Sequence, residues 1–268
     1  MSKRSRSEAF ATAPDGTRIR YVTWANPNAT RRVVLIHALA NVAEFWSATV
    51  DALGPEWEAL AVDCRGHGAS GKPAGPYSVE LMADDIAAVM DHAGWDSAVV
   101  AGASMGGCIA MAVAARHPAR VAGLGLIDTT AWYGENAVTA WEERGQKAVD
   151  GGMAALIGFQ KTRWFSDAFR ESQPEILQDA IDTFTANDVS AYLETCRMLG
   201  RADMRAALGS FQCPVAVMVG EEDYATPIAM AEALVAAVPD ASLTIVPGAR
   251  HLTPLEVPDT VAEIIMSV

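Results

Sequence analysis

The chain lacks long hydrophobic runs and an excess of positive charge, and each absence excludes a class of protein. No apolar stretch reaches the ~20 residues that a helix needs to cross a bilayer, so we expect no membrane span. Lysine and arginine number 20 against 33 aspartates and glutamates, which gives a net charge of −13. Because nucleic-acid backbones require a basic surface, we expect no nucleic-acid partner.

Patterns that would hold a metal or a cofactor are also missing. The four cysteines, at positions 64, 108, 196 and 213, show no Cys-x-x-Cys spacing, which favours reduced thiols in a cytoplasm over a disulfide framework or a zinc site. No glycine loop has the spacing of a phosphate- or dinucleotide-binding site. We therefore expect no metal and no cofactor. The first six residues are basic without a following apolar region, so we expect a short disordered tail and no secretory signal.

The order of apolar patterns predicts an α/β protein. With 268 residues, 51% of them hydrophobic, the chain can bury a full core. Strand-like runs alternate with helical patterns, which predicts a mostly parallel central sheet with helices on both faces. The strands are expected at 18–24, 32–36 and 58–62 and near residues 98, 121, 215 and 243, and the helices at 45–53 and 79–93 and near residues 108, 228 and 260.

The alternation stops between residues 127 and 211, where the pattern is helical and rich in aromatic side chains. We expect residues 129–210 to form a lid inserted into a core made of 1–128 and 211–268, because such aromatics commonly roof an apolar cleft. Most should pack the lid helices together, and the tryptophans expected to contact substrate are Trp132, Trp141 and Trp164. Nearby Arg144 and Arg163 could hold a substrate carboxylate or could form surface ion pairs.

One short segment, Gly102-Ala103-Ser104-Met105-Gly106, stands between an apolar run and a helical run. A strand, a sharp turn with a serine at its apex and a helix make a nucleophile elbow, in which small residues two positions either side let strand and helix approach closely. Ser104 is the predicted nucleophile. The next amide, that of Met105, lies at the start of the helix, where it can stabilise an oxyanion.

An acid and then a histidine follow Ser104 along the chain, the two partners that a serine nucleophile needs. Serine is a weak nucleophile at neutral pH, so it needs an imidazole to accept its proton and a carboxylate to orient that imidazole. Asp223 and His251 each lie on a loop directly after an expected strand, where α/β enzymes place their chemistry. We predict Asp223 as the acid and His251 as the base.

Other titratable residues leave alternatives open. Asp128 also follows an expected strand and is a second candidate for the acid. Glu221 and Glu222 are expected to be solvated loop charges. His37 and His67 lie at strand ends, where we expect them to support the site through hydrogen bonds.

On these motifs the chain resembles the α/β-hydrolases of the serine-hydrolase type. The matching segments are Val33-Val34-Leu35-Ile36-His37, Asp63-Cys64-Arg65-Gly66-His67-Gly68-Ala69-Ser70, the serine elbow, residues 220–227 and Gly248-Ala249-Arg250-His251. The Asp-Cys-Arg-Gly-His-Gly run, Ile127-Asp128-Thr129-Thr130 and Thr162-Arg163-Trp164-Phe165 are similar to 3-oxoadipate enol-lactonases. The resemblance implies that Leu39 supplies the second oxyanion-hole amide. The family usually has His-Gly where this chain has His37-Ala38, and glycine visits a positive φ more freely than alanine.

The resemblance implies hydrolysis of a carboxylic ester or lactone, in the manner of an enol-lactonase of aromatic compound catabolism, with a small-molecule substrate as the partner. Ser104 would form an acyl-enzyme that water then hydrolyses. Two alternatives use the same fold: a carbon–carbon bond hydrolase of the meta-cleavage type and a non-catalytic ligand receptor. The sequence leaves the oligomeric state open, a homo-oligomer included.

Overall fold

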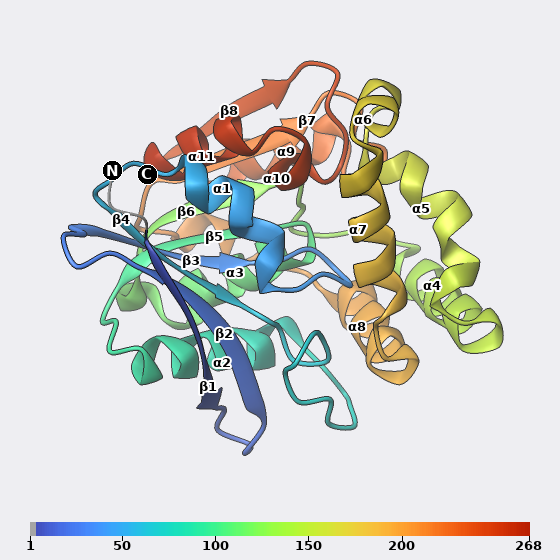
Figure 1. Ribbon diagram of the computed structural model, residues 1–268, viewed down its shortest axis with the longest axis horizontal. Helices are drawn as coiled ribbons and strands as arrows, with labels where there is room; N and C mark the ends of the chain where they lie inside the picture. Colours follow the sequence, from blue (N-terminus) through green and yellow to red (C-terminus); the bar gives the residue numbers. More distant parts are fainter. Residues whose placement is uncertain (1–3) are drawn as a thin grey trace.

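The central element is an eight-stranded sheet in the order β1-β2-β4-β3-β5-β6-β7-β8 (Figure 1), within residues 4–268, which the computed structural model describes. The β1–β2 and β2–β4 pairs are antiparallel, and the other neighbouring pairs are parallel. The prediction of a mostly parallel sheet is therefore confirmed. The strands are β1 Ser5–Thr12, β2 Arg18–Ala25, β3 Arg31–Ile36, β4 Trp57–Val62, β5 Ala98–Ala103, β6 Val121–Ile127, β7 Val215–Gly220 and β8 Ala241–Val246.

Helices cover both faces of the sheet (Figure 1). On one face α1 packs against α11, and on the other α2 packs against α3. The helix α2 begins as its sequence predicts, because the side chain of Ser78 accepts a hydrogen bond from the Leu81 amide. The core helices are α1 Ser47–Ala52, α2 Val79–His92, α3 Met105–Arg116, α9 Ile228–Ala237, α10 Thr253–Glu256 and α11 Pro258–Met266.

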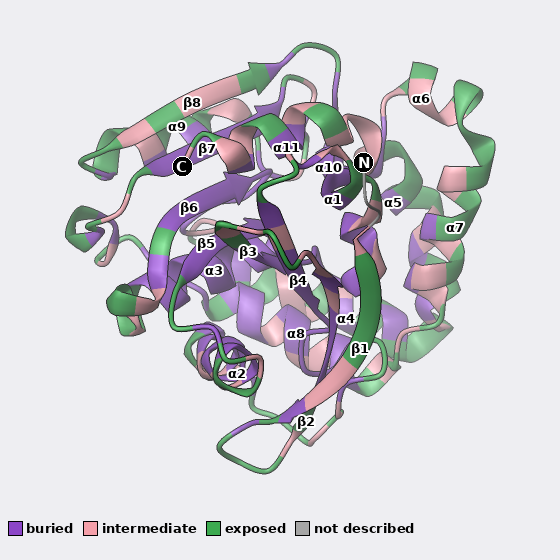
Figure 2. Cartoon of the chain, turned by 60° about the vertical axis from the view of Figure 1, so that its left-hand side comes forward, coloured by how far each residue is buried: buried purple, intermediate pink, exposed green. Residues whose placement is uncertain are grey.

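Burial follows the position of each strand in the sheet (Figure 2). The inner strands β5 and β7 are buried along their whole length. Such strands read as continuous apolar runs, since helices cover both of their faces. The outer strands β1 and β8 carry exposed and half-buried residues, and their sequences are correspondingly more polar.

Five α-helices lie between β6 and β7 and form what we call the helical insertion. They are α4 Ala137–Gly151, α5 Ile157–Trp164, α6 Asp167–Ser172, α7 Pro174–Thr185 and α8 Val189–Arg201. Figure 1 shows them gathered at one end of the sheet, with α4 lying along α8. Through residues 4–268, the helices are all too short or too polar to cross a membrane.

The N-terminal segment departs from the prediction. Met1, Ser2 and Lys3 lie outside the described residues, but the expected disordered tail is wrong from Arg4 onward. The Arg4 guanidinium donates hydrogen bonds to the carbonyls of Val50, Leu53, Gly54 and Trp57. The next residue, Ser5, begins β1. Because most positions of this strand are exposed and polar, the sequence gives no apolar pattern from which to predict it.

Candidate active site

Ser104 lies at the apex of the turn from β5 into α3. Its backbone has φ 51° and ψ −114°, a conformation that L-residues avoid unless the surrounding structure holds them in it. The flanking glycines explain why the turn can be so tight. A Cβ at Gly102 would lie 2.0 Å from the Gly106 carbonyl oxygen, and a Cβ at Gly106 would lie 2.0 Å from that of Ile36.

The structure brings Ser104, His251 and Asp223 together from three separate loops. The Ser104 Oγ lies 2.9 Å from the Nε2 of His251. The Nδ1 of the same ring lies 2.7 Å from the Oδ2 of Asp223. With its Nδ1 proton donated to the carboxylate, the imidazole presents the Nε2 lone pair to the serine hydroxyl. This arrangement can accept a proton from Ser104.

Asp223 is held by its own loop. Its Oδ1 accepts hydrogen bonds from the amides of Ala225 and Thr226, and its Oδ2 accepts one from the Thr226 hydroxyl. Burial by itself would raise the pKa of Asp223, but the attraction of His251 and these hydrogen bonds hold it below its usual value. The carboxylate is therefore kept ionised beside the imidazole.

Asp128, the alternative acid, has a different position. It follows β6 with φ 47°, and its Oδ1 accepts a hydrogen bond from the Gly220 amide. Its Oδ2 accepts two more, from the amide and the hydroxyl of Thr253. Burial and the nearby charge of Asp223 raise the pKa of Asp128 well above its usual value. Asp128 thus connects the backbone just before Asp223 to the backbone just after His251. It does not bind the histidine ring, whose hydrogen-bond partner is Asp223.

Two backbone amides are available near the serine. The Leu39 and Met105 amides donate to no protein acceptor within the described chain, and Met105 is the first residue of α3, where amides have no intrahelical partner. Leu39 lines the cavity described below. The positive φ in this loop falls at Ala40, at 61°, and not at Ala38, so the alanine that replaces the family's glycine is not in the left-handed region.

His37 and His67 support the loops behind this site. The His37 Nδ1 lies 2.7 Å from the carbonyl of Ala38, and its Nε2 accepts a hydrogen bond from the Cys64 amide. The two rings pack edge to face with centroids 5.0 Å apart. Burial lowers the pKa of His37 to about 4, and burial together with His37 lowers that of His67 to about 3. Both are therefore neutral at physiological pH.

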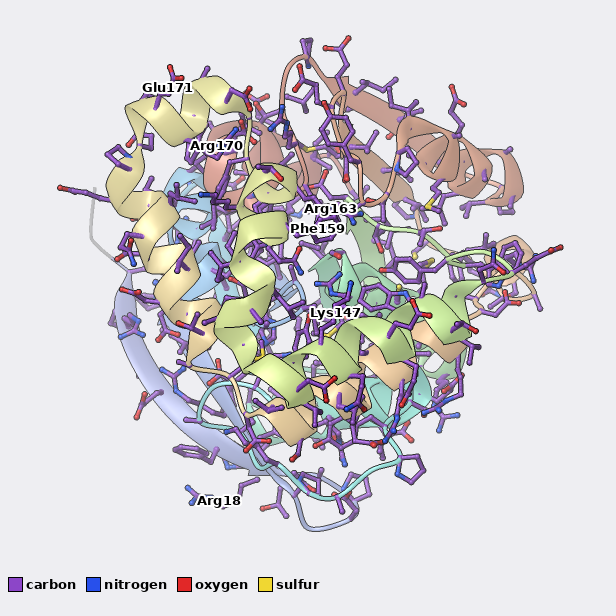
Figure 3. The ribbon with its side chains drawn as sticks, turned by 90° about the vertical axis from the view of Figure 1, so that its right-hand side faces the viewer. Arg18, Lys147, Phe159, Arg163, Arg170 and Glu171 are labelled. Carbon is purple, nitrogen blue, oxygen red and sulfur yellow. The ribbon has the colours of Figure 1, made fainter. Side chains whose placement is uncertain are left out.

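A cavity of about 530 Å³ opens above the serine, between the core loops and the helical insertion. Trp141, Trp164 and Arg144, three of the predicted substrate contacts, line it. Figure 3 views the insertion from outside and labels Phe159 and Arg163, which lie together on α5, and Lys147 on α4, all three of which line this cavity. The cavity wall comprises residues of the core loops, of the segment after β6 and of the insertion, among them Ala38, Leu39, Ser104, Thr226, His251, Tyr133, Trp141, Arg144, Gln160, Arg163 and Trp164.

Trp132 lies elsewhere. Its ring packs under the guanidinium of Arg205, 3.8 Å from ring centroid to Cζ, and its backbone pairs with that of Asp203. It is not among the residues that line the cavity. The predicted contact of Trp132 with substrate is inconsistent with this position, because the turn after β6 directs the neighbouring Tyr133 to the cavity instead.

Two cavity residues carry no signal that the motifs could have detected. Tyr133 packs edge to face on Trp141, with ring centroids 5.1 Å apart. Gln160 is only 2% exposed, and its Nε2 has no hydrogen-bond partner anywhere in residues 4–268. Gln160 lies on α5, and Tyr133 lies in the segment between β6 and α4, so helix phase decides which side chain reaches the cavity in the first case and the course of the backbone decides it in the second.

A mostly parallel sheet with a serine at a strand–helix turn, and an acid and a histidine after later strands, defines a hydrolase of the α/β type. The family model described as "alpha/beta hydrolase fold" matches residues 31–258. The chain belongs to the α/β-hydrolase family and is a hydrolase enzyme.

Comparison with individual proteins agrees with this assignment. The chain is 28% identical over 226 residues to 3-oxoadipate enol-lactonase 2 of Acinetobacter baylyi, covering 84% of each chain. It is 29% identical over 248 residues to a pimeloyl-[acyl-carrier protein] methyl ester esterase of Aromatoleum aromaticum, covering 88% of this chain and 97% of that one. The crystal structure of an enol-lactonase from Burkholderia xenovorans superposes with a TM-score of 0.91 at 30% identity, over 97% of this chain and 98% of that one. The predicted resemblance to enol-lactonases is therefore confirmed.

Proposed function

We propose that this hydrolase cleaves a carboxylic ester or lactone through an acyl-enzyme formed on Ser104. The observation that carries the proposal is the hydrogen-bonded series from Ser104 Oγ through His251 to Asp223, at 2.9 and 2.7 Å. The serine faces a cavity large enough for a small organic molecule. The names of the similar proteins, enol-lactonases and a methyl ester esterase among them, also favour this reaction class.

In the first half of the proposed reaction, Ser104 attacks the substrate carbonyl while His251 Nε2 takes the hydroxyl proton. The negative charge that develops on the carbonyl oxygen accepts hydrogen bonds from the amides of Leu39 and Met105. Asp223 keeps the Nδ1 proton in place and stabilises the imidazolium. The same imidazolium then gives its proton to the departing alkoxide oxygen, and the acyl group stays on the serine.

In the second half, water attacks the acyl-enzyme with His251 again as the base, and the acid product leaves. A lactone adds one requirement, because its leaving alcohol stays joined to the acyl group. We assign residues 129–210 the role of a lid over the core of 1–128 and 211–268. Its residues form the wall of the cavity opposite Ser104, so the lid would hold that alcohol away from the acyl carbon while water enters.

A serine-directed fluorophosphonate tests the proposal. We expect the wild-type protein to gain one label by mass spectrometry and to hydrolyse p-nitrophenyl acetate, whereas Ser104→Ala should do neither while remaining folded.

The other outcomes discriminate among the alternatives. A folded wild type that neither labels nor turns over any ester would contradict the hydrolase proposal and favour a ligand receptor. A wild type that labels but cleaves only vinylogous diketones would show a carbon–carbon bond hydrolase instead.

A further inference from the structure

Two arginines face the cavity without an acidic partner. Arg144 on α4 and Arg163 on α5 both line the cavity, and neither forms an ion pair within residues 4–268. With Lys147 they make three cations in the cavity wall, against the single exposed acid Glu143. Arginines that are partly buried are normally paired, because removing an unpaired charge from water is costly.

The surroundings of Arg144 leave its charge uncompensated. Its Nε donates to the hydroxyl of Tyr192 at 2.8 Å, and its guanidinium lies 4.7 Å from the ring centroid of Trp141. Burial raises the pKa of Tyr192 to about 12, so this phenol is a neutral acceptor. The aromatic ring and the phenol position the guanidinium, and neither supplies a full negative charge.

Arg163 and Gln160 present a second set of free donors. They are three residues apart on α5 and therefore share one face of that helix. The Arg163 Nη2 donates to the Tyr224 carbonyl at 2.9 Å, but its buried Nε has no acceptor in the described residues. The Nε2 of Gln160 is also buried without an acceptor. Buried donors are nearly always paired, so two on one helix face beside a cavity are suited to the acceptor atoms of a bound molecule.

The two arginines also act on each other. Burial lowers the pKa of Arg163 and the positive charge of Arg144 lowers it further, while the negative charge of Asp223 acts in the opposite direction without an ion pair between the two. The two guanidiniums, one on α4 and the other on α5, thus repel each other in the cavity wall. An anion between them would relieve this repulsion and would accept the unused hydrogen bonds.

We propose that Arg144, Gln160 and Arg163 form one anion subsite, and that the ester or lactone cleaved at Ser104 carries a carboxylate that binds there. This inference rests on the proposed function and adds to it the charge of the substrate and the residues that select it. The unpaired donors would then make the enzyme specific for anionic substrates, because a neutral substrate of the same shape would leave these donors without acceptors.

Matched esters test the subsite. The monomethyl esters of succinate, glutarate, adipate and pimelate differ from methyl butanoate, pentanoate, hexanoate and heptanoate only in a terminal carboxylate in place of a methyl group. For the best-fitting length, we expect the wild type to prefer the anionic ester by about tenfold or more in kcat/KM, the value of one hydrogen bond to a charged group. Arg163→Gln and Arg144→Gln should each lower that preference by about tenfold.

The matched control variant is Arg201→Gln, since Arg201 is exposed at the end of α8 and does not line the cavity. It should keep the wild-type preference. Gln160→Leu should lower the preference by a smaller factor, because it removes a neutral donor. If Arg144→Gln does not fold, Arg163→Gln and Gln160→Leu still decide the question. No preference at any length, or an unchanged preference in both arginine variants, would overturn the subsite.

Binding without turnover separates the two proposals. In Ser104→Ala, the preferred half-ester should raise Tm, and the double variant Ser104→Ala with Arg163→Gln should lose this shift. Should the Tm shift appear while the wild type hydrolyses nothing, the subsite stands and the proposed reaction fails. Should the wild type hydrolyse neutral and anionic esters alike, the reaction stands and the subsite fails.

Discussion

Replacing Asp223 by asparagine should nearly abolish turnover while leaving the fold intact. Two backbone amides, of Ala225 and Thr226, point at the Oδ1 position at 2.7 and 2.9 Å, so the asparagine oxygen must occupy that position. Its NH₂ group then takes the place of Oδ2, 2.7 Å from His251 Nδ1, and donates to that nitrogen. The imidazole is forced to carry its proton on Nε2 and cannot accept one from Ser104. We expect a fall of ~10⁴ in kcat, or about 5.4 kcal/mol in the barrier.

Asp128→Asn is the matched comparison, because it makes the same chemical change in the other buried carboxylate. Whichever way its amide is turned, one backbone N–H, that of Gly220 or that of Thr253, loses its acceptor. The expected cost is about 1–3 kcal/mol in the free energy of unfolding, measured by urea titration. Its kcat should fall far less than that of Asp223→Asn. Equal loss of kcat in both variants, or a nearly active Asp223→Asn, would refute the assignment of Asp223 as the partner of His251.

Three further outcomes follow from packing and titration. Gly106→Ala should fail to fold or should have a much lower Tm, because the new Cβ would lie 2.0 Å from a β3 carbonyl oxygen. Gly158→Ala, on α5, has open space at its Cβ and should raise the free energy of unfolding by about 0.5–1 kcal/mol. His37 and His67 are neutral in the folded protein below pH 6.5 but become protonated when it unfolds. The free energy of unfolding should therefore fall by about 1.4 kcal/mol per histidine per pH unit as the pH drops from 6.5 toward about 4. A urea midpoint that stays constant across that range would contradict this. Arg250→Met removes hydrogen bonds to the carbonyls of Thr162 and Phe165 and should lower the free energy of unfolding by about 1–3 kcal/mol. Hydrogen exchange at the end of α5 should become faster, and unchanged exchange would contradict a role for Arg250 in holding this segment.

Local patterns predicted those parts of the fold and site whose geometry is decided within a few residues. The elbow around Ser104 needs small residues at two fixed positions, and the sequence has glycine at both. The helix predicted over residues 79–93 is α2, with its capping serine in place. The strand predicted over 18–24 is β2, which is rich in β-branched and aromatic residues.

Features decided by distant contacts could not be predicted in this way. The strand β1 has few buried residues of its own and exists as the antiparallel partner of β2. Trp132 and Tyr133 are adjacent aromatics after β6, and the sequence does not say which of them faces the cavity. Whether the buried N–H groups of Gln160 and Arg163 find an acceptor depends on the groups that the fold brings near them. Their unpaired state therefore could not be predicted from the spacing of residues in the sequence.

The backbone joins the histidine loop directly to the end of α5. The amide of Leu252 donates to the Trp164 carbonyl at 3.0 Å, and the Arg250 side chain donates to the carbonyls of Thr162 and Phe165. Anyone who exchanges the insertion for that of a relative, in order to change substrate range, therefore also exchanges the acceptors that hold the loop of His251, the proposed general base. A chimera that keeps residues 162–165 of this chain and exchanges only the helices before and after them should hold His251 in its present position. A chimera that replaces the whole insertion would need to recreate these hydrogen bonds.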